Sequence, residues 1–364
     1  MRPSDTLDAP ARRPSLIENI QGGIRVRLRR DGETSAVQLE SSRPVHAVRV
    51  LLGLPVAGAL QALPRLFGVC GHAHLAAAHA ALGLPPPEAG SALRAENLRE
   101  HLLRVHVDWP LLLARPPDAA LAMRLLRACE GLERDPAQLA TLLRLHSLGI
   151  PPEEFLRIDD TAALRAWVRA HGASSPAAAM LEHLSTLPPL TPVDPIAALG
   201  AMDLGRVRER LDDEQAGRFV AMPDEDGACR ETGAHARHAD APLVRALHAE
   251  GRELEARYAA RLRELAWVAL HGVPAPGSEP GIARVETSRG TLLHRIEADA
   301  GGRIERWRVV APTEWNFHPR GVAVRLLRSI PAALDTPRRH RLARLALHVV
   351  DPCVSFELVA DPRE

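Results

Sequence analysis

The sequence contains no lysine, few aromatic residues and no long apolar run. All 46 basic residues are arginine, and the 45 acidic residues leave a net charge of +1. Arginines and carboxylates alternate along the chain and aromatic residues make up only 3% of it, so nucleic-acid binding is not expected. No stretch reaches the ~18 uninterrupted apolar residues of a membrane-spanning helix, and residues 1–15 lack the apolar core of a secretory signal. These absences predict a cytoplasmic protein that binds neither nucleic acid nor membranes.

Cysteine is also scarce, and its four positions are scattered. Cys70, Cys129, Cys229 and Cys353 do not form the pattern of a disulfide framework, so in a reducing compartment we expect free thiols or metal ligands. Cys129 lies in the apolar stretch MRLLRACEGL and is predicted to belong to the core. Cys229 lies in the acidic loop PDEDGACRE, where we expect little thiol reactivity.

The hydrophobic pattern predicts β structure near both ends of the chain and helices between them. Alternating residues, followed by a turn at RDGE, predict a β-hairpin within about 20–52. Helical spacing continues over about 56–271, and its longest helix is predicted at about 241–271. Within the middle, further helices are predicted near 73–83, 93–106, 117–131, 136–147, 160–171 and 176–187.

Strand patterns return at about 282–312. There VETSRGTLLHRIEA is interpreted as one strand and RIERWRVVAP as its hairpin partner across a glycine turn. Two short helices are predicted at about 321–329 and 338–348. The 364 residues, 46% of them hydrophobic, are sufficient for a large core.

Two short segments carry candidate chemistry. In PRLFGVCGHAH, Cys70 stands at a glycine-rich turn where a helix begins, and unpaired backbone N–H groups there would favour a thiolate. His72 and His74 are close enough to orient or shield it. Near the C-terminus, in DPCVSFE, Pro352 stiffens the backbone before Cys353. Each segment alone is more typical of a structural cysteine, and the sequence does not show that the two cysteines meet.

Together the two segments resemble the end motifs of nickel-iron hydrogenase large subunits. The family's R-x-C-G-x-C-x-x-x-H has Phe67 in place of its first cysteine. Its D-P-C-x-x-C-x-x-H has Phe356 in place of its second cysteine and lacks the closing histidine. Three more segments match in order, namely Glu231, Gly233, Ala236 and Arg237 for E-x-G-x-x-A-R; Glu286, Arg289, Gly290 and His294 for E-A-P-R-G-x-x-x-H; and VAPTEWNFHPR for V-P-T-T-W-N-x-x-P-R.

The resemblance implies roles for four residues. In that family four thiolates hold nickel, and two of them bridge to an iron that carries two cyanides and one carbonyl. Cys70 falls on a bridging position and Cys353 on a nickel-terminal position. Arg289 falls on the arginine beside the diatomic ligands, to which a guanidinium can donate hydrogen bonds. His74 falls on the histidine near the bridging thiolate, and Glu18 stands near the family's N-terminal glutamate.

The two phenylalanines change what the resemblance implies. They would fill the vacated ligand positions with apolar bulk, and two thiols are too few for the four-thiolate site, so no bound nickel, no hydrogen activation and no enzyme activity are expected. The chain resembles the HupK-type hydrogenase accessory proteins. That implies a scaffold or chaperone that holds iron transiently, with its cyanide and carbonyl ligands, before transfer. The implied partners are a HypC/HupF-type chaperone, a HypD-type assembly protein and the hydrogenase large-subunit precursor.

The same resemblance implies a fold. We expect an α+β, predominantly helical fold, a reduced form of the large subunit, with residues 1–364 in a single composite domain. Two other functions remain open. One is a structural or binding subunit without metal, and the other is an enzyme. The enzyme would be a variant hydrogenase or an unrelated metal hydrolase using His72, His74, His235 and His238.

Overall fold

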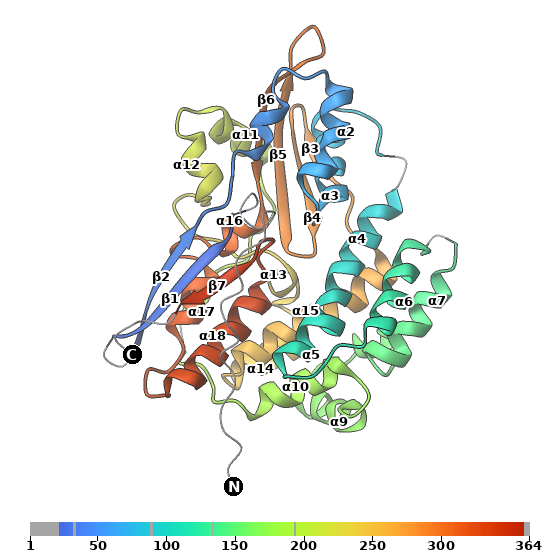
Figure 1. Cartoon of the computed structure of the whole chain (residues 1–364), viewed down its shortest axis with the longest axis vertical. Helices are drawn as coiled ribbons and strands as arrows, with labels where there is room; N and C mark the ends of the chain where they lie inside the picture. Colours follow the sequence, from blue (N-terminus) through green and yellow to red (C-terminus); the bar gives the residue numbers. More distant parts are fainter. Residues whose placement is uncertain (1–21, 32–33, 88–89, 133, 193, 360–364) are drawn as a thin grey trace.

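The protein combines a sheet-containing upper part with a helical body (Figure 1). The computed structural model describes residues 22–31, 34–87, 90–132, 134–192 and 194–359. Glu18 therefore lies outside the described residues. Among those residues no helix has the length and apolarity needed to cross a bilayer. The predicted α+β class is confirmed, with helices and two separate sheets.

The larger sheet is antiparallel and has the order β3-β4-β5-β6. Its strands are β3 (Gly277–Glu279), β4 (Ile282–Thr287), β5 (Gly290–Ala298) and β6 (Ile304–Val310). The segment interpreted as one strand therefore contains two, because a turn at 288–289 separates β4 from β5. The prediction of a single strand here was wrong.

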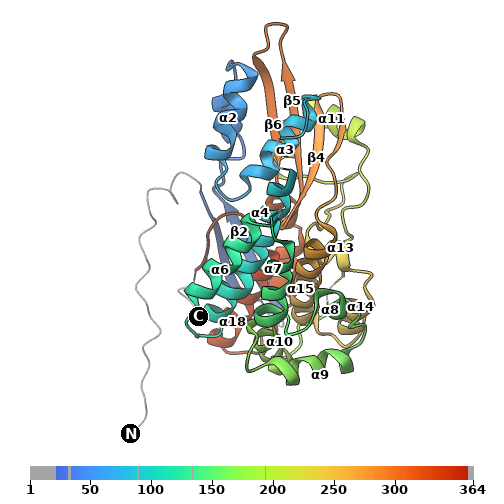
Figure 2. The same cartoon turned by 90° about the vertical axis from the view of Figure 1, so that its right-hand side faces the viewer.

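Both faces of this sheet are covered, as its alternating side chains require. Val285, Leu292 and Val309 pack with α2 (Val56–Leu66) and α3 (Gly71–Ala81). Ile282, Leu293 and Val310 occupy the opposite face, against α11 (Leu204–Asp212) and α12 (Ala216–Ala221). Figure 2 shows α2 and α11 on opposite sides of the strands. The sheet is therefore buried on both faces, and this fixes the register of its strands.

The smaller sheet joins the two ends of the described chain. β1 (Ile24–Asp31) and β2 (Thr34–Ser41) form the predicted hairpin, and β7 (Phe356–Val359) adds to β1 in parallel. Ile24 pairs with Phe356 in this register. Alternate residues of β1 are buried against the helical body. This pairing places the segment around Cys353 directly before an ordered strand.

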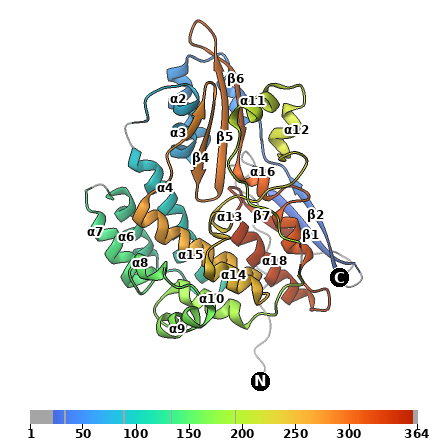
Figure 3. The same cartoon turned by 180° about the vertical axis from the view of Figure 1, so that it is seen from behind.

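Helix α15 (Glu253–His271) runs through the helical body (Figure 3). The predicted helix over 241–271 was wrong in extent, because α14 (Pro242–Ala249) ends before it and Gly251 takes a positive φ of 70° between them. Residues 254–266 are all buried, including several charged side chains. The other helices are η1 (Ala47–Leu51), α4 (Gly90–Leu103), η2 (Arg104–Asp108), α5 (Trp109–Leu112), α6 (Ala119–Glu130), α7 (Pro136–Leu142), η3 (Leu143–Ser147), α8 (Pro152–Phe155), α9 (Thr161–His171), α10 (Pro176–Thr186), α13 (Ala234–His238), α16 (Pro312–Asn316), α17 (Val322–Arg328) and α18 (Thr336–Val350).

Candidate functional site

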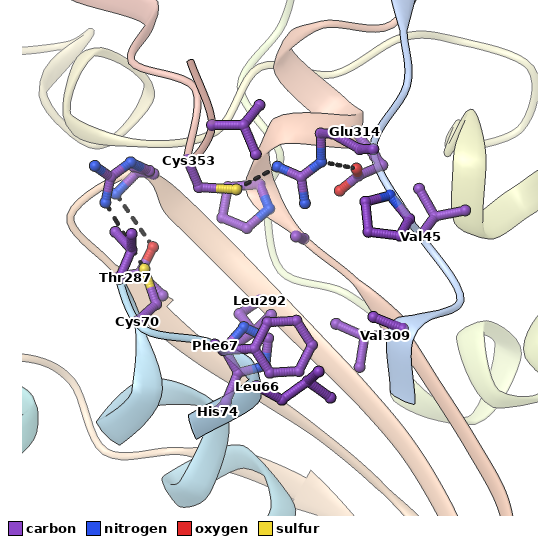
Figure 4. A pocket seen from close by; sticks show the side chains of 18 of the residues that line it. Val45, Leu66, Phe67, Cys70, His74, Thr287, Leu292, Val309, Glu314 and Cys353 are labelled. Atoms are coloured by element: carbon purple, nitrogen blue, oxygen red, sulfur yellow. Dashed lines mark hydrogen bonds and ion pairs between the residues drawn. The ribbon is translucent and has the colours of Figure 1, made fainter. Parts of the chain in front are cut away.

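A cavity of about 300 Å³ lies where the α2–α3 turn, the β4–β5 turn and the C-terminal segment meet. Cys70, His74, Arg289 and Cys353 all line it, although the two cysteines are 283 positions apart in the sequence (353 − 70). Figure 4 shows Cys70 and His74 in one part of the cavity and Cys353 toward Glu314 in another. The fold thus brings together all four residues that the resemblance singled out.

Cys70 stands at the N-cap of α3, as the sequence predicted. The expectation that helix N–H groups would favour its thiolate was wrong. Glu96 accepts the hydrogen bonds of the His72 and Ala73 amides at 2.8 and 3.0 Å, so these donors are already satisfied. Burial raises the pKa of the Cys70 thiol to about 12, although Arg289 opposes this shift. Cys70 is therefore a protonated thiol at neutral pH.

The ring of His74 belongs to a hydrogen-bonded chain behind Cys70. Trp307 Nε1 donates to His294 Nδ1 at 3.2 Å, so the proton of a neutral His294 is on Nε2. That nitrogen lies 2.8 Å from His74 Nδ1, which must accept. Burial lowers the pKa of His294 to about 3, and burial together with His294 also lowers that of His74. Both rings are therefore neutral at pH 7.

Phe67 fills space next to this chain. It follows α2 and stacks on His74 with ring centroids 3.7 Å apart and planes 6° apart. It also lines the cavity, as expected for an aromatic ring in a vacated ligand position. Phe356 lines an adjoining cavity, which Cys353 and Arg289 also line, and its ring packs edge-on against His348 at 5.0 Å. The two phenylalanines therefore fill space in two neighbouring cavities.

Arg289 is held rigidly at the tight turn between β4 and β5. Its Nη2 donates to Glu100 at 3.0 Å, its Nε lies 3.4 Å from Asp351, and its Nη1 lies 3.7 Å from Cys70 Sγ. Burial opposes the charge, but Asp351, Cys70 and Glu100 raise the pKa of Arg289 above its usual value. A permanently charged guanidinium therefore faces the Cys70 sulfur.

Glycine contacts fix the turn that carries Arg289. Gly290 has a φ of 128°, and a Cβ there would lie 2.5 Å from Thr232. Gly233 has a φ of 109°, and a Cβ there would lie 2.8 Å from the carbonyl oxygen of Arg289. Asn316 bridges the same backbones. Its Oδ1 accepts from Thr232 N and its Nδ2 donates to Thr232 O, both at 3.0 Å, and Nδ2 also donates to Arg289 O at 3.4 Å. Three of the matched segments thus meet in one close-packed junction.

Asp351 holds the turn that carries Cys353, the second cysteine of the cavity. It ends α18 with a left-handed φ of 60°, two residues before Cys353. Its carboxylate lies 2.8 Å from Arg104 Nη2 and 3.1 Å from Arg261 Nη1, in addition to its contact with Arg289. Burial alone would raise the pKa of Asp351, but the three guanidiniums hold it well below the usual 3.8. The carboxylate therefore ties the cysteine turn to three separate parts of the chain.

Arg43 and Thr313 contact the sulfur of Cys353, and sequence reasoning missed both. An Nη1 donor of Arg43 and the hydroxyl of Thr313, the latter at 3.2 Å, point at Sγ. Arg43 Nε also lies 2.9 Å from Glu314, which is 7% exposed. Burial opposes the charge of Arg43, whereas Glu314 and Cys353 raise its pKa. Thr313 and Glu314 lie inside a matched segment, whereas Arg43 lies in no motif and no sequence signal points to it.

The remaining candidates lie outside the cavity. Cys129 is 1% exposed in the core, as predicted. Cys229 is partly buried, with its sulfur 3.1 Å from His318 Nδ1. His235 and His238 pair with Glu231 and Glu264 in the helical body. These residues do not join the thiols, so the multi-histidine hydrolase site considered from the sequence is not assembled there.

The cavity offers two sulfurs, two guanidiniums and otherwise mainly apolar walls. The apolar wall residues include Leu66, Val69, Leu292, Val309, Ala311 and Pro312. Thiol sulfurs are soft ligands that suit iron and other thiophilic metals, and a guanidinium donates hydrogen bonds without an acceptor group of its own. The volume is at the lower end for small-molecule sites. The donor set therefore fits a small, soft-metal unit that needs hydrogen-bond donors beside apolar surface.

Comparison with known proteins gives relatives along most of the chain. The sequence is 32% identical over 366 residues to the hydrogenase expression/formation protein HupK of Rhizobium leguminosarum bv. viciae, covering 89% of this chain and 92% of that protein. It is 30% identical over 359 residues to the hydrogenase expression/formation protein HoxV of Cupriavidus necator, covering 87% and 91%. No protein-family model matches the sequence.

Solved structures share the fold. A chain of the Ni-Fe-Se hydrogenase from Desulfovibrio vulgaris Hildenborough superimposes with a TM-score of 0.53 at 17% identity, covering 89% of this chain and 94% of that one. The corresponding enzyme from Desulfomicrobium baculatum gives 0.50 at 15% identity, covering 90% and 95%. At such low identity the likeness shows the fold alone, which is that of the hydrogenase large subunit.

Proposed function

Because the chain belongs to the HupK and HoxV family of hydrogenase expression/formation proteins, we propose that it is an accessory scaffold in hydrogenase maturation. Its cargo would be one iron with cyanide and carbonyl ligands, held between Cys70 and Cys353 until transfer to the large-subunit precursor. The observation that carries this proposal is the convergence of both thiols and Arg289 on one cavity. Two sulfur ligands leave iron incompletely held by protein, and this suits release.

The residues around the thiols support distinct roles in such holding. Arg289 is fixed by Glu100 and Asp351, so its free donors can face cyanide nitrogen. The apolar walls exclude water from the unit. Since a metal binds the thiolate form, iron binding at Cys70 would release a proton. Phe67 takes the place of one thiol, which supports holding of iron without hydrogen activation.

The proposed partners would approach at the open side of the cavity. We propose the HypC/HupF-type chaperone and the HypD-type assembly protein as donors, and the large-subunit precursor as acceptor. Val50 lines the cavity and is 70% exposed, and Leu52 and Leu54 nearby are 41% and 38% exposed. Exposed apolar residues at a cavity mouth suit a protein contact. Val50→Asp should reduce co-purification with these partners, whereas Leu145→Asp, at another exposed position on η3 (53%), should not.

A metal-free structural role is the second candidate, and the contact of Arg43 with Cys353 favours it. A guanidinium already neutralises the charge that this sulfur would carry as a thiolate. In this alternative the two cysteines serve only as polar packing groups. Substitution of either cysteine by serine would then leave hydrogenase maturation in the host unchanged.

One experiment separates the candidates. The untagged chain is purified anaerobically from cells that express the maturation proteins, and infrared spectra and iron content are measured. The iron carrier predicts cyanide and carbonyl bands with about one iron per chain, lost in Cys70→Ser and Cys353→Ser but kept in the control Cys229→Ser. Iron-free wild type without bands would refute iron holding. Normal host hydrogenase activity after deletion of the whole chain would refute the maturation role itself.

A further inference from the structure

Two histidines in the helical body point the same ring nitrogen at one another. His235 lies on α13 and His248 on α14, and Glu253 begins α15. In the described part of the chain these three form the one group of His, Cys, Asp or Glu ligand atoms that all lie within 4.8 Å of one another. Figure 3 shows α13, α14 and the start of α15 close together. None of the three residues lines the cysteine cavity, and they play no part in the function proposed above.

Each ring is oriented from behind by a carboxylate. His235 Nδ1 lies 2.9 Å from Glu231 Oε1, and His248 Nδ1 lies 2.8 Å from Glu253 Oε2. The two Nε2 atoms are left facing each other at 2.8 Å. Arg257 holds both carboxylates in place, with Nη2 3.1 Å from Glu231 and Nε 2.6 Å from Glu253. Metal-ligating histidines are typically oriented in this way, since the second nitrogen donates to a carboxylate.

The arrangement leaves a place for a cation between the rings. Glu231 and Glu253 are each paired with Arg257, so their oxygens accept the Nδ1 protons of the two rings. Each Nε2 then presents a lone pair, and the two lone pairs face each other across 2.8 Å. Either a shared proton or a metal cation fits between them.

A divalent cation can bind both of these lone pairs at once. We propose that His235 and His248 form a site for a borderline divalent cation such as zinc or nickel, with both Nε2 atoms as ligands. Imidazole suits these metals. Glu231 and Glu253 orient the rings and balance the charge. The side chains of His235 and His248 are 15% and 30% exposed, so water can complete the coordination.

The site adjoins the cysteine cavity but does not depend on it. Glu231, His235 and Arg289 line a common small cavity of about 20 Å³, so His235 lies behind the wall that carries Arg289. Every proposed ligand belongs to residues 231–253. The cation site therefore stands or falls separately from iron holding by the thiols.

Cobalt(II) is a suitable probe because its spectrum reports the ligand type. The untagged full chain carrying Cys70→Ser and Cys353→Ser should bind one equivalent in equilibrium dialysis, with weak visible bands and no intense near-ultraviolet sulfur charge transfer. In that background His235→Gln or His248→Gln should abolish stoichiometric binding. Glu253→Gln should weaken it about tenfold or more, and the matched control His183→Gln, on α10, should bind normally. Binding that survives both histidine substitutions would overturn the proposal.

A second measurement needs no variant. Zinc should protect His235 and His248 from carbethoxylation by diethyl pyrocarbonate, read by peptide mass spectrometry, while His183 is modified equally with and without zinc. Equal modification of the two histidines in both conditions would mean that a shared proton alone joins the rings. Circular dichroism of the glutamine variants shows whether lost binding reflects lost folding.

Discussion

The two cysteines of the cavity lie in opposite environments. Around Cys70, burial disfavours the thiolate and the nearby helix amides are already bonded to Glu96. One guanidinium nitrogen of Arg289 lies 3.7 Å from its sulfur. Cys353 has two hydrogen-bond donors directed at its sulfur, from Arg43 and Thr313. The difference teaches that position at a helix start does not decide the state of a thiol. For Cys70, burial decides it first, and the donors that remain available to the sulfur come second.

The surroundings of Cys70 and of Cys353, the two sides of the cavity, are joined by one carboxylate. Removing its charge should have the largest effect on stability. Asp351 lies among Arg104, Arg261 and Arg289, so Asp351→Asn leaves buried guanidiniums without their counter-charge. We expect a loss of roughly 3–5 kcal/mol in the free energy of unfolding, measured by urea denaturation. Asp226→Asn is a matched control, because Asp226 also has a positive φ and an arginine partner but is exposed. It should cost under about 1 kcal/mol.

The same carboxylate predicts a pH dependence. The folded-state pKa of Asp351 is below its usual 3.8, so its contribution is complete above that value and is lost as the pH falls further. Glu231, with a pKa of about 2 against a usual 4.5, acts in the same direction. Wild-type stability should therefore decline below about pH 4, and more steeply than that of Asp351→Asn. Parallel declines would show that Asp351 is not the group that titrates.

Thiol chemistry tests the comparison directly. A pKa raised from 9.0 to about 12 leaves about 1,000-fold less thiolate at pH 8 than in an unperturbed cysteine. Iodoacetamide should therefore alkylate Cys70 about 1,000-fold more slowly than a cysteine in a short peptide. Rates come from peptide mass spectrometry over time. The Cys70 rate should still rise above pH 10, and a plateau near pH 9 would contradict the assigned environment.

The sequence predicted which helices and strands exist better than it predicted where they begin and end. The first hairpin, α17 and α18 follow from alternation and helical spacing. The four residues that the resemblance singled out, Cys70, His74, Arg289 and Cys353, line one cavity. The break at Gly251 was missed, since a single glycine competes with strong helical periodicity on both sides. The turn at 288–289 was missed because no typical pair of turn residues marks it. Instead, the hydroxyl of Thr287 accepts hydrogen bonds from the backbone N–H groups of Arg289 and Gly290.

The site could be predicted only where a motif marked it. Arg43 reaches Cys353 across 310 positions (353 − 43), and no local pattern encodes a contact of that range. Glu96 is one polar residue on a helix, and only the fold shows that its carboxylate caps α3. Such contacts depend on how distant elements pack, and this information is absent from spacing along one chain.

Arg43 and Glu314 should show a moderate coupling on the Cys353 side. Arg43→Gln alone leaves Glu314 as a buried carboxylate whose pKa burial already raises, so it should destabilise strongly. Arg43→Gln combined with Glu314→Gln should recover part of that loss, with a coupling of about 2 kcal/mol in a double-mutant cycle. Urea unfolding of the four proteins gives the value. Strict additivity would mean that the ion pair is not formed in solution.

The smallest expected effect is the most selective between the two sides. Phe67→Leu removes the ring stacked on His74 and should cost about 1 kcal/mol, and Phe356→Leu, outside the cavity, should cost a similar amount. Only the first change admits water beside Cys70. Because burial is the main cause of the raised pKa of Cys70, Phe67→Leu should speed its alkylation several-fold while leaving Cys353 unchanged. If the alkylation of both cysteines becomes faster, the whole cavity opens together. The difference between the surroundings of Cys70 and Cys353 is then not set by the residues next to each sulfur.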